Sequence, residues 1–188
     1  MTKRPIVLAS ASPRRQELLK SAGIEFVVRP ADIAEVPLRG ETPLAFAERM
    51  ALEKARAARH YADEIILAAD TVVAIADEIL GKPEDAGDAV RMLRQLSGKT
   101  HGVITGVCLS GKDFEDVRSE TTAVEFSAIS EVEAREYVAS DEPMDKAGAY
   151  AIQGGAARWI TKVEGDYYNV VGLPVELVKR MLREHGAI

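Results

Sequence analysis

The sequence predicts an α/β fold in a single domain spanning residues 1–188. Short apolar runs alternate with amphipathic helical segments at the start of the chain, which is the pattern of a β-α-β-α unit. Further along, two apolar runs joined by a polar turn predict neighbouring strands. The chain has 188 residues, 47% of them hydrophobic, so it can bury one sizeable core and leaves room for two lobes around a cleft.

Two helix starts of the same kind occur in the first third of the chain. Ser12 and Thr42 each stand directly before a proline, which predicts an N-cap followed by proline at the first helical position. We expect the first helix to end at Gly23 and the second near Ala62. Apolar runs predict the neighbouring strands at residues 6–9, 24–28 and 65–73.

Three more helices are predicted in the rest of the chain. The first is an amphipathic segment at 86–96. A capping box of Ser130 and Glu133 opens the second. The third starts at Pro174 and stops at Gly186. The same part of the chain has strand patterns at 103–109 and 121–129, around Tyr150 and around Ile160.

Charge and composition exclude several classes of protein. The formal net charge of −6 argues against stable nucleic-acid binding, because such proteins usually displace counterions with a net positive surface. No apolar run has the length of a membrane span, and the first residues lack the pattern of a signal peptide. The single cysteine, Cys108, lies in an apolar run that predicts a buried, inert thiol. We therefore expect a soluble, cytoplasmic protein.

The turn Ser10-Ala11-Ser12-Pro13-Arg14-Arg15 is the first candidate binding site. It places two arginines in the first turn of a helix, where the helix dipole already concentrates positive charge. An anion would make this arrangement favourable through free backbone N–H groups, serine hydroxyls and guanidinium contacts, and triphosphate fits best. The alternative is a solvated turn in which serine only caps the helix and the arginines face water.

Two lysines are further candidates for phosphate binding. Lys54 falls on the inward face of the second helix, so it either reaches a negative group or extends its amine to water. Lys82, in Leu80-Gly81-Lys82-Pro83, lies in a constrained loop and is weak evidence when considered alone.

Asp70 is the strongest acidic candidate. It follows the apolar run at 65–69, and a buried carboxylate is costly unless it binds a cation or hydrogen-bond donors. Open α/β sheets place ligands at the carboxyl ends of their strands, where we expect Asp70 to lie. The alternative is that Asp70 caps a turn with Thr71. Glu35, in the polar linker after the second strand, is a candidate second metal ligand or a plain surface glutamate.

Five segments taken together resemble the Maf family, and the likeness spans nearly the whole chain. They are Ser10-Ala11-Ser12-Pro13-Arg14-Arg15, Ala69-Asp70-Thr71-Val72-Val73, Gly81-Lys82-Pro83, Asp145-Lys146-Ala147-Gly148-Ala149-Tyr150-Ala151-Ile152-Gln153-Gly154 and Asn169-Val170-Val171-Gly172-Leu173-Pro174. The resemblance implies a mixed central sheet flanked by helices, two lobes around a cleft, an architecture related to the inosine triphosphate pyrophosphatases, and a homodimer.

The resemblance also implies a reaction: hydrolysis of a nucleoside triphosphate to its monophosphate and pyrophosphate, with a divalent metal such as Mg²⁺ or Mn²⁺. By that likeness Asp70 is the catalytic carboxylate, and Asp70 with Glu35 holds the metal. Two roles are open to Asp70, removing a proton from water or chiefly holding metal and water. The positions tied to substrate choice are Arg14, Thr71 and Gln153, and those tied to the phosphates are Ser10, Ser12, Arg15, Lys54 and Lys82.

The segment ending in Tyr150-Ala151-Ile152-Gln153-Gly154 is similar to the branch of the family that acts on dTTP and UTP. Gln153 suits this branch, because an amide offers both a donor and an acceptor to the edge of uracil or thymine. The resemblance thus implies a nucleotide-pool housecleaning enzyme, with modified pyrimidine nucleotides as further substrates. The alternative is a non-catalytic nucleotide sensor that regulates septum formation and cell division.

Overall fold

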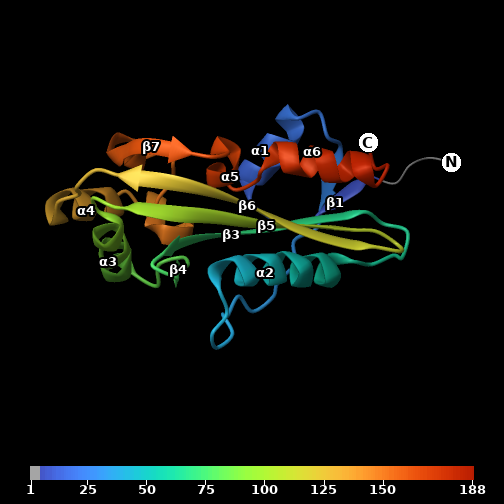
Figure 1. Cartoon of the computed structure of the whole chain (residues 1–188), viewed down its shortest axis with the longest axis horizontal. Helices are drawn as coiled ribbons and strands as arrows, with labels where there is room; N and C mark the ends of the chain where they lie inside the picture. The colour runs from blue at the N-terminus through green and yellow to red at the C-terminus, as the bar shows by residue number, and fades with distance from the viewer. Residues whose placement is uncertain (1–4) are drawn as a thin grey trace.

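A single seven-stranded sheet organises the part of the chain that the computed structural model describes, residues 5–188 (Figure 1). The order of the strands is β2-β1-β3-β5-β6-β7, with β4 paired to β3. β1, β2 and β3 are parallel and the remaining pairs are antiparallel, so the sheet is mixed as predicted. The strands are β1 Ile6–Leu8, β2 Phe26–Val28, β3 Ile66–Ile75, β4 Glu78–Leu80, β5 Thr100–Ser110, β6 Glu115–Phe126 and β7 Ile160–Glu164.

The helices begin where the sequence places their caps. Ser12, Thr42 and Ser130 each accept a hydrogen bond from a backbone N–H three residues on, and Ser130 forms the full capping box with Glu133. The helices are α1 Pro13–Ser21, α2 Pro43–Ala58, α3 Ala86–Leu96, α4 Glu131–Val138, α5 Tyr167–Val171 and α6 Val175–Glu184, with short 3₁₀ turns η1 Glu142–Asp145, η2 Ala147–Ala149 and η3 Gly155–Trp159.

Alternation along β3 assigns its residues to the two faces of the sheet. Ile66 and Ala68 pack in one apolar cluster with the buried alanines of α2. Leu67 and Ala69 pack in another with Leu19 of α1 and the apolar residues of α6. Successive side chains of a strand point to opposite faces, so Asp70 belongs to the α2 face and Thr71 to the α1 and α6 face.

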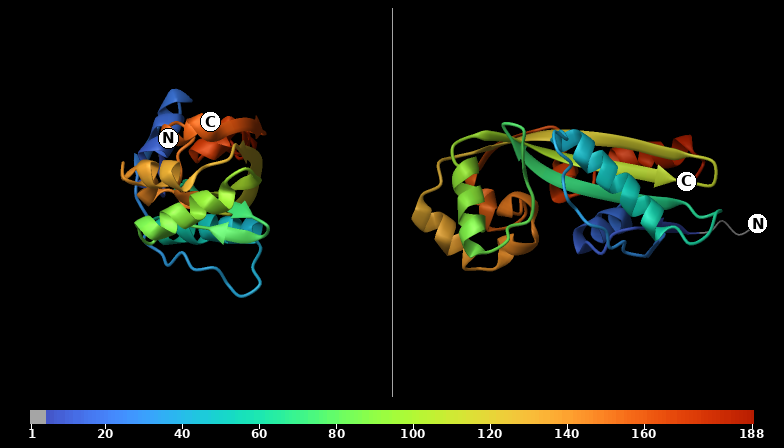
Figure 2. Two further views of the ribbon diagram at one scale, coloured as in Figure 1. Left: turned by 90° about the vertical axis from the view of Figure 1, so that its left-hand side faces the viewer. Right: turned by 90° about the horizontal axis from the view of Figure 1, so that it is seen from below.

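The molecule has two lobes joined by long strands. Figure 2 shows α3, α4 and the 3₁₀ turns gathered at one end of β5 and β6, and α1, α2 and α6 at the other end. A separate apolar cluster, which includes Phe126, Trp159 and Leu93, forms the core of the α3 and α4 end. Because β5 and β6 run through both lobes, they fix the distance between the walls of the space that lies between them.

Several predicted boundaries were wrong. The segment around Tyr150 is not a strand but follows a 3₁₀ turn, and β6 begins six residues earlier than predicted, at Glu115. α2 ends at Ala58, before the predicted end near Ala62, because Arg59 adopts an extended conformation as its C-cap. Cys108 is fully buried in β5 as predicted, and burial raises the pKa of its thiol to about 12.

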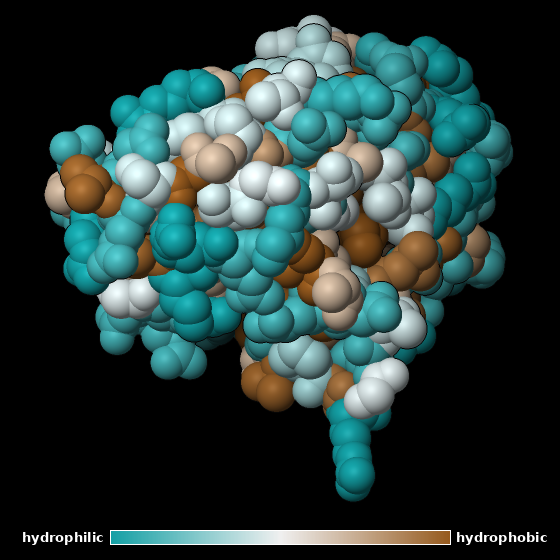
Figure 3. Space-filling model, turned by 60° about the vertical axis from the view of Figure 1, so that its left-hand side comes forward, coloured by the Kyte–Doolittle hydropathy of each residue, from teal (hydrophilic) through white to brown (hydrophobic). Residues whose placement is uncertain are grey.

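One face of the molecule is largely polar. Figure 3 shows this face, on which hydrophilic residues predominate and apolar residues appear in small, separated groups. Within residues 5–188, every helix is too short or too polar to cross a membrane.

Candidate active site

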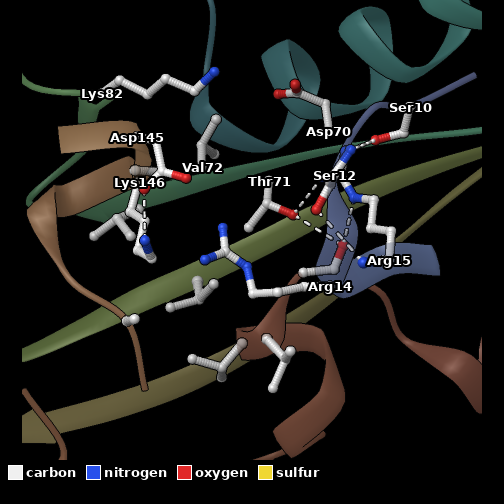
Figure 4. A pocket seen from close by; sticks show the side chains of 18 of the residues that line it. Ser10, Ser12, Arg14, Arg15, Asp70, Thr71, Val72, Lys82, Asp145 and Lys146 are labelled. Carbon is white, nitrogen blue, oxygen red and sulfur yellow. Dashed lines mark hydrogen bonds and ion pairs between the residues drawn. The ribbon is translucent and has the colours of Figure 1, made fainter. Parts of the chain in front are cut away.

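A cleft of about 970 Å³ lies between the two lobes. One wall consists of the turn before α1, the middle of β3 and the end of α5, and we call it the sheet wall. The opposite wall consists of the loop after β4 and the segment from η1 to Gly154, and we call it the turn wall (Figure 4). A ligand of nucleotide size fits this volume, since small-molecule sites in proteins occupy roughly 300–1,000 Å³.

Asp70 lies in the middle of β3 and not at its carboxyl end, so that part of the prediction was wrong. β1 pairs with β3 as far as Leu67, and β4 pairs with it from Val73. Between these two neighbours, Asp70 has β5 as its strand partner, opposite Gly106. The carboxyl end of the shorter strand β1 therefore creates the opening, and Asp70 faces it from β3. A turn-capping role for Asp70 is excluded by the same pairing.

Lys54 carries the positive charge that compensates for burial of Asp70. Its amine Nζ lies 2.6 Å from Asp70 Oδ1 and 2.7 Å from Glu35 Oε1, and the lysine is 8% exposed. Gly106 makes this possible, because a Cβ there would overlap the backbone of α2 at Ala47. Of the two alternatives left open by the sequence, Lys54 therefore takes the one in which it reaches a negative group, and it does not extend its amine to water.

Glu35 and Asp70 converge on one cationic group from two different elements. Burial is the largest effect on Glu35 and acts to raise its pKa, but the hydrogen bond to Lys54 and the nearby charges of Lys54, Lys82 and Arg15 together lower that pKa. Among residues 5–188 no group of three or more His, Cys, Asp or Glu side chains is arranged to hold a metal ion. The site thus offers two carboxylates, which is what Mg²⁺ commonly uses when phosphate oxygens supply further ligands.

The serines of the first turn are used within the turn itself. Ser12 Oγ accepts the backbone N–H of Arg15 at 3.5 Å, and Ser10 Oγ accepts the backbone N–H of Ser12 at 3.2 Å. Ser10 is only 8% exposed. Both hydroxyls retain a proton to donate, so contact with a phosphate is compatible with this geometry and stays a prediction.

Arg15 is bound to the protein through all three of its nitrogens. Its Nε donates to the carbonyl of Gly172 at 2.8 Å, Nη1 donates to Ser10 Oγ at 3.2 Å, and Nη2 donates to Thr71 Oγ1 at 3.0 Å. Burial lowers its pKa most, and the charges of Asp70 and Glu35 act in the opposite direction. Arg15 therefore fixes the turn to β3 and to the residue after α5.

Thr71 continues this network away from the cleft. Its hydroxyl lies 2.9 Å from Thr105 Oγ1, and Thr105 Oγ1 donates to the carbonyl of Asn169 at 3.3 Å. Thr71 Oγ1 accepts from Arg15, and its one proton is within reach of both Thr105 Oγ1 and the carbonyl of Gly172, the latter at 3.4 Å. Thr71 lines the cleft, and its role in substrate choice stays a prediction.

Arg14 and Lys82 are the uncommitted cations of the cleft. Both line it from opposite walls, and neither forms a hydrogen bond or ion pair with the part of the chain that the structure describes. Figure 4 shows the guanidinium of Arg14 and the amine of Lys82 pointing into the space between the walls. These two side chains can therefore bind a ligand without first breaking an existing interaction.

Gln153 is the uncommitted amide of the turn wall. It is exposed, lines the cleft, and forms no hydrogen bond to any other residue within 5–188. Tyr150, three residues earlier in the chain, is buried, and its hydroxyl lies 2.8 Å from His101 Nε2. The amide group is thus free while the backbone that carries it is anchored.

Three cleft residues were not identified as site residues from the sequence. Asp145 and Lys146 form an ion pair of 2.5 Å on the turn wall, and Glu142 accepts the backbone N–H of Gly155 at 3.1 Å. Hydrogen bonding to Lys146 is the largest effect on Asp145 and lowers its pKa, with a further contribution from the charge of Arg14 across the cleft. The segment 145–154 was singled out in the sequence, but the pairing within it depends on 3₁₀ turns that have no clear sequence pattern.

The chain is similar to known proteins along nearly its whole length. A family model described as Maf-like protein matches residues 5–185. The chain is 52% identical to a dTTP/UTP pyrophosphatase of Koribacter versatilis over 97% of this chain and 95% of that protein. It is also 52% identical to a dTTP/UTP pyrophosphatase of Geobacter sp. strain M21 over 100% of this chain and 99% of that protein. Similarity to a solved dITP/XTP pyrophosphatase from Mycobacterium abscessus is weak, with a TM-score of 0.48 and 18% identity over 98% of each chain.

Proposed function

This chain belongs to the Maf-like protein family, and we propose that it hydrolyses dTTP and UTP to the nucleoside monophosphate and pyrophosphate. Modified pyrimidine nucleoside triphosphates belong to the same proposal, because Gln153 would contact only one edge of the base. Such an enzyme removes nucleotides from the cellular pool. The two relatives named above, which carry the name dTTP/UTP pyrophosphatase, support the choice of substrate.

One observation carries the proposal: a buried carboxylate and two uncommitted cations line the same cleft of nucleotide size. Asp70 is 5% exposed, and Arg14 and Lys82 point into the same space from opposite walls. A triphosphate would satisfy both cations at once. Guanidinium binds phosphate oxygens in pairs and the lysine amine binds as a point charge, so the two support different oxygens.

A divalent ion, Mg²⁺ or Mn²⁺, fits the donors at hand. Asp70 and Glu35 would hold it with the phosphate oxygens, and Lys54 would then shift its amine toward the triphosphate. When bound, such an ion neutralises charge on the phosphates and polarises the bond that breaks.

In the proposed reaction, a water molecule adds its oxygen to the α-phosphorus. The bond from that phosphorus to the oxygen bridging to the β-phosphate breaks, and its electron pair leaves with pyrophosphate. Asp70 accepts the proton of the water, while Arg14 and Lys82 stabilise charge that builds up on the leaving group. Arg15 takes part by keeping the turn in place, since its nitrogens already bind the protein.

The test is a panel of nucleoside triphosphates assayed with Mg²⁺, Mn²⁺ or EDTA, with pyrophosphate and orthophosphate measured separately. We expect pyrophosphate from dTTP and UTP, and no turnover in EDTA. Orthophosphate as the first product would contradict attack at the α-phosphorus. Tight binding of nucleotides without any product would instead support the sensor that acts in septum formation.

The base selectivity has its own test. Gln153→Glu replaces the amide donor with an acceptor, so we expect the preference for UTP over CTP to fall by about tenfold or more. Equal rates on both nucleotides in the unsubstituted protein would contradict the assigned role of Gln153. A homodimer and a cytoplasmic location are further parts of the proposal, and light scattering and cell fractionation test them.

A further inference from the structure

Three hydrogen bonds that involve side chains hold residues 150–155, which include Gln153, to the rest of the protein. The hydroxyl of Tyr150 lies 2.8 Å from His101 Nε2, and the backbone N–H of Ala151 donates to Tyr137 Oη at 3.2 Å. Both bonds lie on the N-terminal side of Gln153. On the C-terminal side, the backbone N–H of Gly155 donates to the carboxylate of Glu142 at 3.1 Å.

Glu142 contributes the one acidic side chain that takes part in these three hydrogen bonds. Glu142 is the first residue of η1. Lys146 Nζ donates to the backbone carbonyl of Glu142 at 2.7 Å, and this hydrogen bond stabilises the turn. A hydrogen bond from a backbone N–H to a carboxylate is stronger than one between neutral groups. Glu142 is therefore suited to fix the backbone directly after Gln153.

Gly154 has no side chain where one would collide with this carboxylate. A Cβ built on Gly154 would overlap the carboxylate oxygens and carbon of Glu142. The backbone angles of Gly154, φ −111° and ψ −154°, are extended, so its conformation alone does not demand glycine. The space that glycine leaves free is occupied by the Glu142 carboxylate.

We propose that Glu142, seated over Gly154, is a positioning residue that sets the base selectivity of Gln153. The inference rests on the function proposed above. Gln153 has no partner of its own within the described chain, so its aim depends on the backbone on either side. Releasing the bond to Gly155 frees the C-terminal side of that backbone, and misplacement of a binding group by about 1 Å can cost a factor of about 100 in rate.

Four variants test the proposal: Glu142→Ala, Glu142→Gln, Gly154→Ala and the double variant Glu142→Ala with Gly154→Ala. Glu142→Ala removes the acceptor, whereas Glu142→Gln keeps an oxygen that can accept from Gly155. Gly154→Ala pushes the carboxylate aside without removing it. Each variant is assayed for kcat and KM on UTP and CTP, and the urea midpoint is measured as a control for folding.

We expect Glu142→Ala to raise the KM for UTP and to reduce the UTP preference over CTP by about tenfold, with kcat changed less. Glu142→Gln restores most of the preference. Gly154→Ala behaves like Glu142→Ala, and the double variant is no worse than either single variant, because both changes break the same bond. Independent, multiplying losses in the double variant would overturn the proposal, as would an unchanged preference in Glu142→Ala.

A readout without substrate separates this proposal from the proposed function. In ¹⁵N-labelled protein, the amide hydrogen of Gly155 is expected to exchange faster with solvent in Glu142→Ala and Gly154→Ala than in the unsubstituted protein. In Glu142→Gln the slow exchange remains. A Gly155 amide whose exchange is the same in Glu142→Ala and Gly154→Ala as in the unsubstituted protein overturns the positioning role, even if the protein hydrolyses UTP. A responsive signal in a protein that hydrolyses nothing refutes the proposed function alone.

Discussion

The two walls of the cleft are built in different ways. On the sheet wall, Arg15 and Thr71 have their polar groups paired with the protein, and Asp70 is fixed in the middle of a ten-residue strand and paired with Lys54 of α2. On the turn wall, the chain runs through the two 3₁₀ turns η1 and η2, and Gln153 projects from it without a partner among residues 5–188.

The difference indicates a division of labour. Groups that must stabilise a transition state gain most from being held in advance, because no reorganisation is then needed during the reaction. Groups that recognise a base have to accept one shape and refuse others, and a wall made of turns can vary without disturbing the sheet. Four predictions test whether the walls differ in this way.

The largest effect is expected at Asp70. Replacement by Asn keeps an oxygen that can accept from Lys54 but removes the negative charge, so turnover of UTP should fall by about 10³-fold or more while the protein stays folded. Steady-state kinetics with pyrophosphate detection measure the loss, and circular dichroism checks the fold. Near-normal turnover in this variant would show that the chemistry does not depend on the sheet wall.

The neighbouring arginines give the next comparison. Arg15→Lys keeps the charge but cannot bind Gly172, Ser10 and Thr71 together, so we expect kcat/KM to fall by about 100-fold and stability to fall by about 2 kcal/mol. Arg14→Lys should change KM only a few-fold and leave stability unchanged, because Arg14 has no partner in the described chain. Urea denaturation measures the stability of both variants, and steady-state kinetics measure their kcat and KM. Equal effects at the two positions would contradict the distinction drawn between them.

His101, which contacts Tyr150 of the turn wall, makes the free energy of unfolding depend on pH. Burial lowers the pKa of His101 to about 4, below the value of about 6.5 in an unfolded chain. The unfolded state therefore binds more protons between these values, and stability falls as the pH falls. Lowering the pH from 7 to 5 should cost about 2 kcal/mol through this residue. Urea denaturation at both pH values measures the loss, which His101→Gln should abolish; an equal loss in that variant would assign it to other groups.

The smallest effect is expected at Thr105. Thr105→Val removes the hydroxyl that connects Thr71 with the carbonyl of Asn169, and should reduce stability by about 1 kcal/mol and kcat/KM about fivefold. Thr105→Ser keeps the hydroxyl and serves as the control for altered volume. A loss of kcat/KM in Thr105→Ser with none in Thr105→Val would show that the methyl group and not the hydrogen bond supports the sheet wall.

The elements whose signals are local could be predicted from the sequence. Ser12 with Pro13 and Ser130 with Glu133 determine where helices begin, and both starts were placed correctly. α5 was missed because five residues are too few to show a helical period. The position of Asp70 was misjudged because a polar residue in an apolar run suggests a strand end, whereas Asp70 is tolerated within β3 by Lys54 from another element.

The candidate site residues named from the sequence lie together in the structure, and their roles there stay predictions. Each of them lines the cleft, including Ser12, Lys82 and Glu35. What could not be predicted was that Arg15 is occupied and Arg14 is free, because the partner of Arg15 is the carbonyl of Gly172, 157 residues along the chain. Adjacent residues of one type can differ in this respect only through the fold.

The alternation of Asp70 and Thr71 across β3 limits how this family member can change in length. Deleting or inserting one residue before Asp70 would turn its carboxylate to the opposite face of the sheet and turn a threonine or alanine toward Lys54, so the buried amine of Lys54 would lose the carboxylate of Asp70. A change of two residues would restore the faces but shift the pairing with β5. Evolution of this strand is therefore confined to substitution, and length variation has to be taken up elsewhere, in the loops of the turn wall.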